Sequence, residues 1–292
     1  MTDTEVSTAT RLGPLIDRLL ALLPVPYQVD WATVPAAAWR RQRFHSGLLG
    51  SSAIDAIELE DLFNIDQQKQ QLETNTRQFL KGLPANNALL WGARGTGKSS
   101  LIHALLNTFA ADGLRLVEVA KEDLVELPLV VEALSQAPYR FILFCDDLSF
   151  EADDGSYKQL KSALEGSLFK TATNILIYAT SNRRHLVPEY MADNQAAQHV
   201  GGELHEAEVV EEKISLSDRF GLWLSFYPFQ QEDYLQVVRH WVAKHAAEHD
   251  VQVDLQADEL RAEALRWALA RGVRSGRTAQ YFARHWIGRA GL

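Results

Sequence analysis

The sequence predicts an α/β fold: a five-stranded, mostly parallel sheet covered by helices, with an N-terminal helical preface and a C-terminal all-helical domain. Three observations predict it. From about residue 86, short apolar runs alternate with amphipathic helical patterns, as in a parallel sheet with helices on both faces. After Pro228 the pattern is helical only. The 292 residues are about twice the usual length of one domain, which allows a large core and a second unit.

The preface is expected to span residues 1–50. Its first ten residues are mostly polar and are interpreted as a mobile arm. The apolar residues that follow recur at helical spacing and predict a helix: Leu12, Leu15, Ile16, Leu19, Leu20 and Leu23. Proline-containing connections come next, at Pro24, Pro26 and Pro35.

The α/β domain is expected to span residues 51–228 and the helical domain, which we call the lid, residues 229–292. Each expected strand is a short apolar run with polar or turn-forming neighbours. These strands lie at residues 88–91, 114–119, 140–146, 174–179 and 222–226. The lid contains three helical patterns, at residues 230–249, 256–271 and 275–289.

Charge is distributed unevenly along the chain. The sequence has 38 acidic and 29 basic residues, a net charge of −9. Residues 261–292 contain seven arginines, no lysine and one acid, a net charge of +6, so residues 1–260 carry −15. Residues 186–212 contain seven acids and no lysine or arginine, and are interpreted as an acidic surface loop. The chain as a whole does not resemble a nucleic-acid binder, but its C-terminal end is basic.

The composition excludes several classes of protein. Apolar residues make up 47% and charged residues 23%, which is typical of a globular chain. The single cysteine, Cys145, rules out an internal disulfide and a multi-cysteine zinc site, and is interpreted as an inert packing residue. No apolar run approaches the roughly 18 residues of a membrane span, and the start of the chain lacks the basic charge of a signal peptide. We therefore expect a cytoplasmic protein.

Residues 92–99, Gly-Ala-Arg-Gly-Thr-Gly-Lys-Ser, match the phosphate-binding pattern GxxxxGK[S/T] and lie between an expected strand and a helical run. The glycines let successive backbone N–H groups point inward, and the start of the helix adds the positive end of its dipole. In this pattern Lys98 reaches the β- and γ-phosphates, and Ser99 offers a hydroxyl to Mg²⁺. The sequence thus predicts a site for ATP and Mg²⁺ at Gly92, Ala93, Arg94, Gly95, Thr96, Gly97, Lys98, Ser99 and Ser100.

Polar residues end two further strands of the expected sheet. Asp146 and Asp147 follow a five-residue apolar run, at the strand edge where α/β folds bind ligands. Asp146 is expected to hold Mg²⁺, largely through water, and Asp147 to orient or deprotonate the attacking water. Asn182 ends the next strand and is expected to hold that water against the γ-phosphate. An aspartate pair that only caps a helix, and an asparagine that only forms a turn, are the simpler alternatives.

The order of these motifs resembles that of AAA+ ATPases. A phosphate loop is followed by an acidic strand end, a polar strand end, an arginine before a fifth strand and a helical lid. The segments Asn75–Gly82 and Trp91–Ser100 look in addition like those of a bacterial family of predicted AAA+ ATPases catalogued as a domain of unknown function. The resemblance covers roughly residues 50–290.

The resemblance implies roles for further residues. Phe63 and Ile65 fall where AAA+ proteins usually contact adenine. Arg219 matches the arginine finger that such proteins insert into the site of a neighbouring subunit, which implies a homo-oligomeric ring or arc. Arg277, with Arg274 as second choice, matches the lid arginine that senses the γ-phosphate. For these lid arginines, a solvated basic start of a helix is the alternative.

Two departures from AAA+ proteins bear on activity. The pair Asp146-Asp147 stands where many of these motors have Asp-Glu and resembles the pair seen in replication initiators, so either slower hydrolysis or a repositioned water is expected. Residues 120–124 contain no aromatic residue, unlike the pore loop of protein-threading members.

The sequence leaves three functions open. The leading hypothesis is an ATP hydrolase that remodels or assembles a macromolecular partner. The alternative is an initiator-like or loader-like switch, in which ATP controls binding to nucleic acid through the arginine-rich lid. A small-molecule kinase is a third. The histidines at 240, 245 and 249 are interpreted as a solvated helix face rather than a zinc site, and the tryptophans of the C-terminal half as core residues.

Overall fold

The computed structural model describes residues 29–41, 46–52, 55–150, 155–164, 172–183, 186 and 216–291. The strands are β1 (Ala36–Arg41), β2 (Ser46–Ser51), β3 (Ala88–Gly92), β4 (Leu114–Glu118), β5 (Arg140–Cys145), β6 (Ile175–Ser181) and β7 (Leu222–Phe226). They form one sheet in the order β2-β1-β4-β5-β6-β3-β7, in which only β1 and β2 pair antiparallel. The helix expected at 12–23, the arm before it and nearly all of the acidic loop at 186–212 lie outside the described residues.

The sheet has seven strands where the sequence predicts five. All five expected strands are present, as β3 to β7, and β1 and β2 extend the sheet beyond β4. All of β1 and all but the last residue of β2 lie in residues 1–50, for which the sequence predicts a helical preface. β1 opens with three alanines, a residue depleted in strands, so local propensity does not indicate it. Parallel pairing with β4, from Ala36 opposite Leu116 to Ala38 opposite Glu118, determines its conformation instead.

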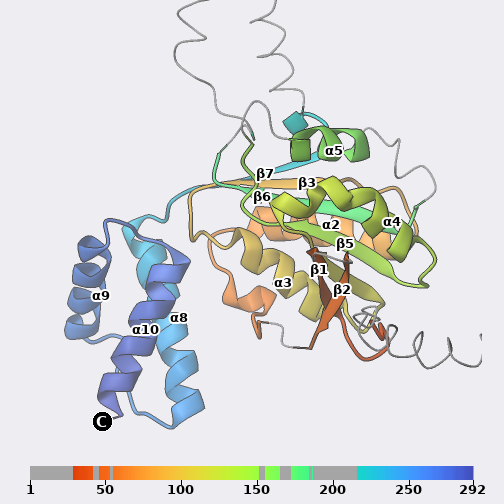
Figure 1. Cartoon of the computed structure of the whole chain (residues 1–292). Coiled ribbons are helices and arrows are strands. Elements are labelled where there is room, and N and C mark those ends of the chain that lie inside the picture. Colours follow the sequence, from red (N-terminus) through yellow and green to blue (C-terminus); the bar gives the residue numbers. More distant parts are fainter. Residues whose placement is uncertain are drawn as a thin grey trace, which may run out of the picture.

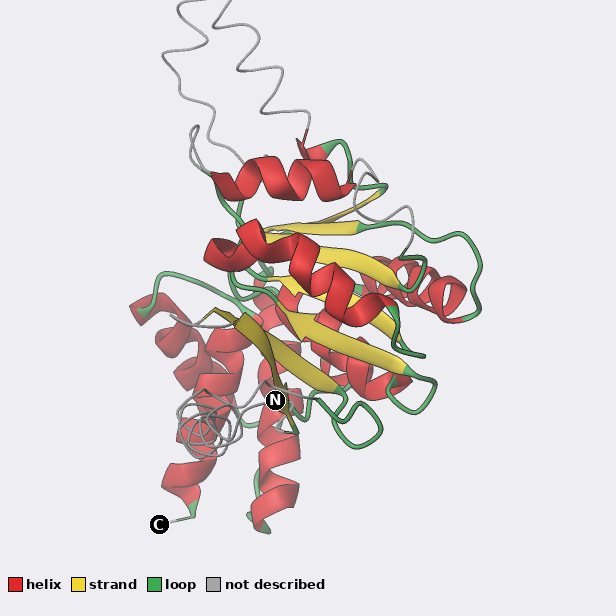
Figure 2. Cartoon of the chain, turned by 45° about the vertical axis from the view of Figure 1, so that its right-hand side comes forward, coloured by secondary structure: helices red, strands yellow, loops and turns green. Residues whose placement is uncertain are grey.

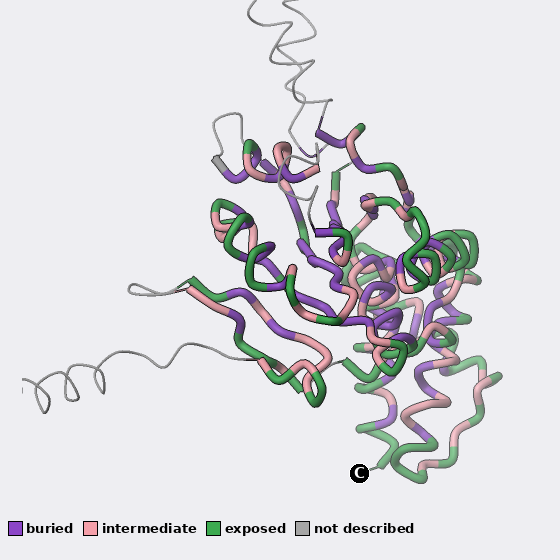
Figure 3. The backbone as a smooth tube through the Cα atoms, turned by 90° about the vertical axis from the view of Figure 1, so that its right-hand side faces the viewer, coloured by how far each residue is buried: buried purple, intermediate pink, exposed green. Residues whose placement is uncertain are grey.

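Helices cover both faces of the sheet. α2 (Asp66–Leu80) and α3 (Lys98–Phe109) pack on one face, and α4 (Leu127–Ser135) and α5 (Gly155–Leu164) on the other (Figure 1, Figure 2). Neighbouring strand residues therefore enter opposite cores: Leu89 packs in the core with α4, and Leu90 in the core with α3. Figure 3 shows buried residues running along the strands. Because both cores exclude water, the central strands are nearly continuous apolar runs, which made them predictable.

The C-terminal helices form a bundle with its own core. The bundle, which is the expected lid, consists of α8 (Gln231–His249), α9 (Asp258–Ala270) and α10 (Gly276–Ala290), and it lies beside the sheet in Figure 1. Tyr234, Val242, Ala264 and Phe282 are buried in its core. Among the described residues, no helix combines the length and the apolar content that a membrane crossing requires.

A buried carboxylate links the lid to the segment before α2. Asp61 ends the short 3-10 helix η1 (Leu59–Asp61) and is 4% exposed. Both of its oxygens accept from Lys244 Nζ, at 2.8 and 2.7 Å, and Oδ1 lies 2.8 Å from His240 Nε2. Burial alone would raise the pKa of Asp61, but hydrogen bonds from Lys244, from the Glu58 backbone and from His240 hold it below its ordinary value. Asp61 is therefore ionised and fixes α8 against η1.

Replacing Asp61 by asparagine should destabilise the fold in a pH-dependent way. We expect Asp61→Asn to lower the free energy of unfolding, measured in urea at pH 7, by about 1–3 kcal/mol, because Lys244 and His240 lose a charged partner. The carboxylate stabilises the fold above its unfolded pKa near 3.9 and ceases to do so as the pH falls through its lower folded pKa. The difference between the variant and the native chain should therefore shrink below about pH 4.

A matched control is Asp66→Asn, since the Asp66 carboxylate is 84% exposed and forms an ion pair with Lys69 at 3.0 Å. Its effect should stay below about 0.5 kcal/mol. Equal losses in the two variants, or a loss in Asp61→Asn that is the same at pH 3 and pH 7, would contradict the role given to Asp61.

Candidate functional site

The phosphate loop joins the end of β3 to the start of α3. Gly92, Gly95 and Gly97 all have positive φ, at 132°, 74° and 100°, a region that favours glycine. A Cβ at Gly92 would lie 2.0 Å from the Phe226 carbonyl oxygen, so β7 leaves no room for a side chain there. The loop backbone is tied to the same strand, since Ala93 N donates to Phe226 O at 3.0 Å. The loop therefore has a fixed place at the C-terminal edge of the sheet.

The Lys98 ammonium lies inside this loop. It donates to the carbonyl oxygens of Gly92 and Ala93, at 2.9 and 2.8 Å, and to Asn182 Oδ1 at 3.2 Å. The residue is 6% exposed. Burial lowers the pKa of Lys98 to about 8; the carboxylates of Asp146 and Asp147 act in the opposite direction. An anion that entered the loop would meet a cation already in position.

Asp146 connects the phosphate loop with two central strands. Its Oδ1 accepts from Ser99 Oγ at 2.7 Å and from Thr180 Oγ1 at 2.5 Å. The Thr180 hydroxyl in turn accepts from the backbone N–H of Asp147 at 2.8 Å. β5 ends just before Asp146, and Thr180 belongs to the neighbouring β6, so the parallel pairing of the two strands brings these groups together. Ser99 and Asp146, which are each expected to hold Mg²⁺, are thus hydrogen-bonded to each other.

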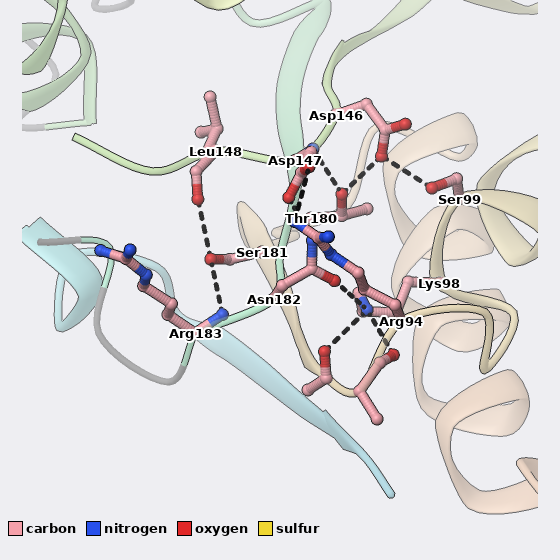
Figure 4. A network of polar contacts seen from close by, with 12 residues as sticks. Arg94, Lys98, Ser99, Asp146, Asp147, Leu148, Thr180, Ser181, Asn182 and Arg183 are labelled. Atoms are coloured by element: carbon pink, nitrogen blue, oxygen red, sulfur yellow. Dashed lines mark hydrogen bonds and ion pairs between the residues drawn. The ribbon is translucent and has the colours of Figure 1, made fainter. Parts of the chain in front are cut away.

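Both oxygens of the Asp147 carboxylate face a donor. Asn182 Nδ2 donates to Oδ1, and the Arg94 guanidinium lies 4.0 Å from Oδ2 (Figure 4). The backbone of Asp147 has a φ of 50°, an uncommon value for a residue other than glycine, which accompanies the turn at the end of β5. Asn182 therefore bridges the two residues: its Oδ1 accepts from Lys98, and its Nδ2 donates to Asp147.

A cavity of about 830 Å³ opens over this network, between the sheet edge and the lid. Phosphate-loop residues 94–100 form its floor, with Asp146, Asp147 and Asn182 beside them. The expected base contacts Phe63 and Ile65 also line it, as does Arg277 at the start of α10. The remaining lining is largely from the lid: Phe229, Val237, Trp241, Lys244, His245, Glu248, Gly276, Gln280, Tyr281 and Arg284.

Two predicted site residues lie away from this cavity. Arg274 is exposed in the connection between α9 and α10 and is not part of the lining, whereas Arg277, three residues on, is. Arg219 is partly buried in the turn before β7 and does not line the cavity either. Of the two lid arginines, therefore, only Arg277 lies where it could meet a ligand of the same chain.

Comparison with protein families gives a match over most of the chain. Residues 32–290 match a family described as "Protein of unknown function (DUF815)". The chain belongs to this family. The resemblance to a family of unknown function, noted from the phosphate loop, is therefore confirmed. No curated protein sequence matches the chain.

The solved structures that match this chain are similar to it only distantly. The Holliday junction branch migration motor RuvB of Thermotoga maritima is 14% identical with a TM-score of 0.43, over 80% of this chain and 74% of that one. A replication initiator DnaA bound to AMPPCP and single-stranded DNA is 14% identical with a TM-score of 0.48, over 83% and 67%. A DNA replication initiation factor is 12% identical with a TM-score of 0.46, over 82% and 67%.

Several site residues could not be singled out from the sequence. Thr180, which fixes Asp146 and the Asp147 backbone, is one of three polar residues at the end of β6, and only its position opposite β5 distinguishes it. Gln280, Tyr281 and Arg284 lie on the same side of α10 as Arg277, spaced by one and two turns. The arginine-rich C-terminal sequence indicated that Arg284 belongs to a basic region, but it did not indicate that Arg284 lines the cavity.

The residues present fit a Mg²⁺ ion. The Ser99 hydroxyl and the Asp146 carboxylate lie 2.7 Å apart, and such oxygen donors, few in number and completed by water, are what Mg²⁺ takes in phosphate sites. In the described part of the chain, no three His, Cys, Asp or Glu side chains group together as metal ligands. The interpretation of the histidines of α8 as a solvated face is wrong for two of them. The His240 side chain is 26% exposed and lies 2.8 Å from Asp61, and the His245 side chain is 13% exposed and lies 2.8 Å from Glu248.

Proposed function

We propose that this protein is an AAA+ ATPase that binds ATP with Mg²⁺, hydrolyses it and uses the change in nucleotide state to remodel or assemble a macromolecular partner. One observation carries the proposal. A phosphate loop, its lysine, a hydroxyl–carboxylate pair and a second carboxylate held by an asparagine form one connected network under a cavity. This is the set of groups that phosphoryl transfer to water requires.

The triphosphate binds in the phosphate loop. Lys98 turns from the carbonyls of Gly92 and Ala93 towards the β- and γ-phosphates, and the N–H groups at the start of α3 face the same anion. The base lies in the apolar part of the cavity, which Phe63, Ile65, Phe229 and Val237 line. Arg277 reaches the γ-phosphate from the lid.

Hydrolysis requires a water molecule positioned against the γ-phosphorus. Asp147 accepts a proton from this water as its oxygen attacks, and the ADP β-phosphate oxygen leaves with the electron pair of the broken bond. Asn182 orients both Asp147 and the water. Ser99 and Asp146 hold Mg²⁺, which when bound neutralises charge on the transferred phosphoryl group.

Arg219 acts on the site of a neighbouring copy. Arg219 precedes β7, whereas the phosphate loop follows the parallel strand β3. Arg219 and the phosphate loop therefore lie at opposite ends of these two strands, about 16 Å apart along a five-residue strand. That separation supports a contact in trans. The active form is therefore a homo-oligomer, a ring or an arc.

The lid transmits the nucleotide state. Gly276 N, in the first turn of α10, donates to Gly95 O at 2.8 Å, and a Cβ at Gly95 would lie 2.8 Å from Ser275 Oγ. The start of α10 thus rests on the apex of the phosphate loop. A phosphate that reshapes the loop also displaces α10, and with it the lid.

Two substitutions test the proposed reaction. Lys98→Ala should weaken ATP binding at least about 100-fold, because the loop loses its buried cation, while Asp147→Asn should keep binding and lose turnover. ATP affinity is measured by calorimetry and turnover by phosphate release. Lys81→Ala, at the exposed end of α2, is the control and should match the native protein. Native binding in Lys98→Ala would overturn the assignment of the cavity.

The arginine finger is tested by complementation. Arg219→Ala should bind ATP within about twofold of the native protein but lose at least about 100-fold in turnover. Mixing it with the inactive Asp147→Asn chain should restore phosphate release, because the second variant supplies Arg219 to the intact cavity of the first. Full turnover by Arg219→Ala alone, or no recovery in the mixture, would exclude action in trans.

ATP affinity should depend on pH through Lys98. Its pKa is about 8 in the free protein, and a bound triphosphate, being anionic, raises it. Above pH 8, binding must therefore take up a proton, and affinity should fall by up to about tenfold per pH unit, whereas from pH 7.5 to 8 it should change little. Calorimetry from pH 7.5 to 10 measures the change. Lys98→Arg, which stays charged, should remove it; a flat profile for the native protein would contradict the role of Lys98.

A further inference from the structure

Helix α10 of the lid carries positive charge and has no acidic residue of its own. The sequence contains no Asp or Glu after Glu263, and α10 holds three arginines, all exposed: Arg277, Arg284 and Arg289. Arg271, also exposed, ends α9 beside them. We call these four arginines, with the side chains of Trp267, Tyr281, His285 and Trp286 among them, the basic face.

The arginines of the basic face differ from the other arginines of the lid in their partners. Arg261 pairs with Glu232 at 2.8 Å and Arg266 with Glu263 at 2.6 Å. In the described part of the chain, no carboxylate is recorded within 4.0 Å of the four arginines of the basic face. Their charge is thus available to an external anion.

Aromatic rings order part of this charge. The Arg271 guanidinium lies 3.6 Å from the centroid of the Trp267 ring, and the His285 ring stacks on the same tryptophan at 4.9 Å. Arg289 lies 4.8 Å from the Trp286 ring centroid. Tyr281 is 48% exposed and leaves a ring accessible. Such pairs hold the planar guanidinium groups in place, which lowers the entropy lost when they bind a ligand.

We infer that the basic face binds single-stranded nucleic acid, which would be the partner of the proposed function. Exposed guanidinium groups suit a chain of phosphates, and the exposed rings of Tyr281 and His285 suit unpaired bases, whereas Trp267 and Trp286 pack partly against the lid core. Because bases are stacked inside a duplex but accessible in a single strand, the exposed rings favour a single strand, and they also distinguish nucleic acid from an acidic peptide.

The basic face meets the nucleotide cavity at one edge. Arg277, Tyr281 and Arg284 belong to both, because they line the cavity and lie on the exposed side of α10. From Arg277 to Arg289 the helix rises about 18 Å away from the phosphate loop. A γ-phosphate that recruits Arg277 therefore withdraws one cation from the basic face, which couples the two ligands.

The test uses the full chain without nucleotide and fluorescent 20-mers of oligo-dT and oligo-U, followed by anisotropy from 50 to 200 mM KCl. Arg271→Gln/Arg289→Gln should weaken binding at least about tenfold and reduce the slope of log affinity against log salt by about 1.4, since each phosphate contact on a single strand contributes about 0.7. The matched control, Arg261→Gln/Arg266→Gln, removes the same charge from the same bundle and should change affinity less than about twofold.

Three outcomes would overturn the inference: no binding at 50 mM KCl, equal losses in the two double variants, or equal competition by polyglutamate, which would identify an acidic protein surface as the ligand. If the double variant unfolds, the single variant Arg289→Glu, at an exposed position, replaces it in the same binding measurement.

The variant Lys98→Ala separates the proposed nucleic-acid binding from the proposed ATPase activity. Oligonucleotide binding that survives in this variant supports the basic face whether or not the chain hydrolyses ATP, and phosphate release by a chain that binds no oligonucleotide supports the ATPase alone.

Discussion

The position of β3 between β6 and β7 is the constraint on which the rest of the site depends. Parallel pairing sets Trp91 opposite Ser181 and Gly92 opposite Phe226, so the phosphate loop emerges beside the polar end of β6 and against the backbone of β7. A shift of one residue would exchange the two faces of β3 and move Leu89 and Leu90 into the wrong cores. Apolar packing on both faces therefore fixes the register, and the register places Lys98 next to Asn182.

The charged groups of the site have partners within the chain. The Lys98 ammonium donates hydrogen bonds to carbonyl oxygens of the loop. The Asp147 carboxylate accepts a hydrogen bond from Asn182 and lies near the Arg94 guanidinium. These contacts keep charged groups paired in a partly buried place, where an unpaired charge would be costly. They also hold the groups close to where a triphosphate would need them, so that binding would exchange partners rather than assemble the site.

The lid has two chemically different surfaces because its charges are segregated. One surface faces the cavity and is tied to the rest of the chain by Asp61 and by the contact of Gly276 with Gly95. The other holds arginines without carboxylate partners in the described residues. The segregation follows from the sequence, in which a net charge of +6 over residues 261–292 is joined to −15 over the remainder. α10 belongs to both surfaces and is the element through which they can communicate.

The sequence by itself determined the phosphate loop, the five central strands and the three lid helices, because each depends on local spacing: glycines at a turn, apolar runs buried on two faces, or a 3.6-residue period. Tertiary structure alone decided β1 and β2, which are extended because they pair with each other and because β1 also pairs with β4. It also decided that Thr180 holds Asp146, and that Arg277 rather than Arg274 meets the cavity. These outcomes depend on which strands and helices become neighbours, a property of the whole fold that no local pattern encodes.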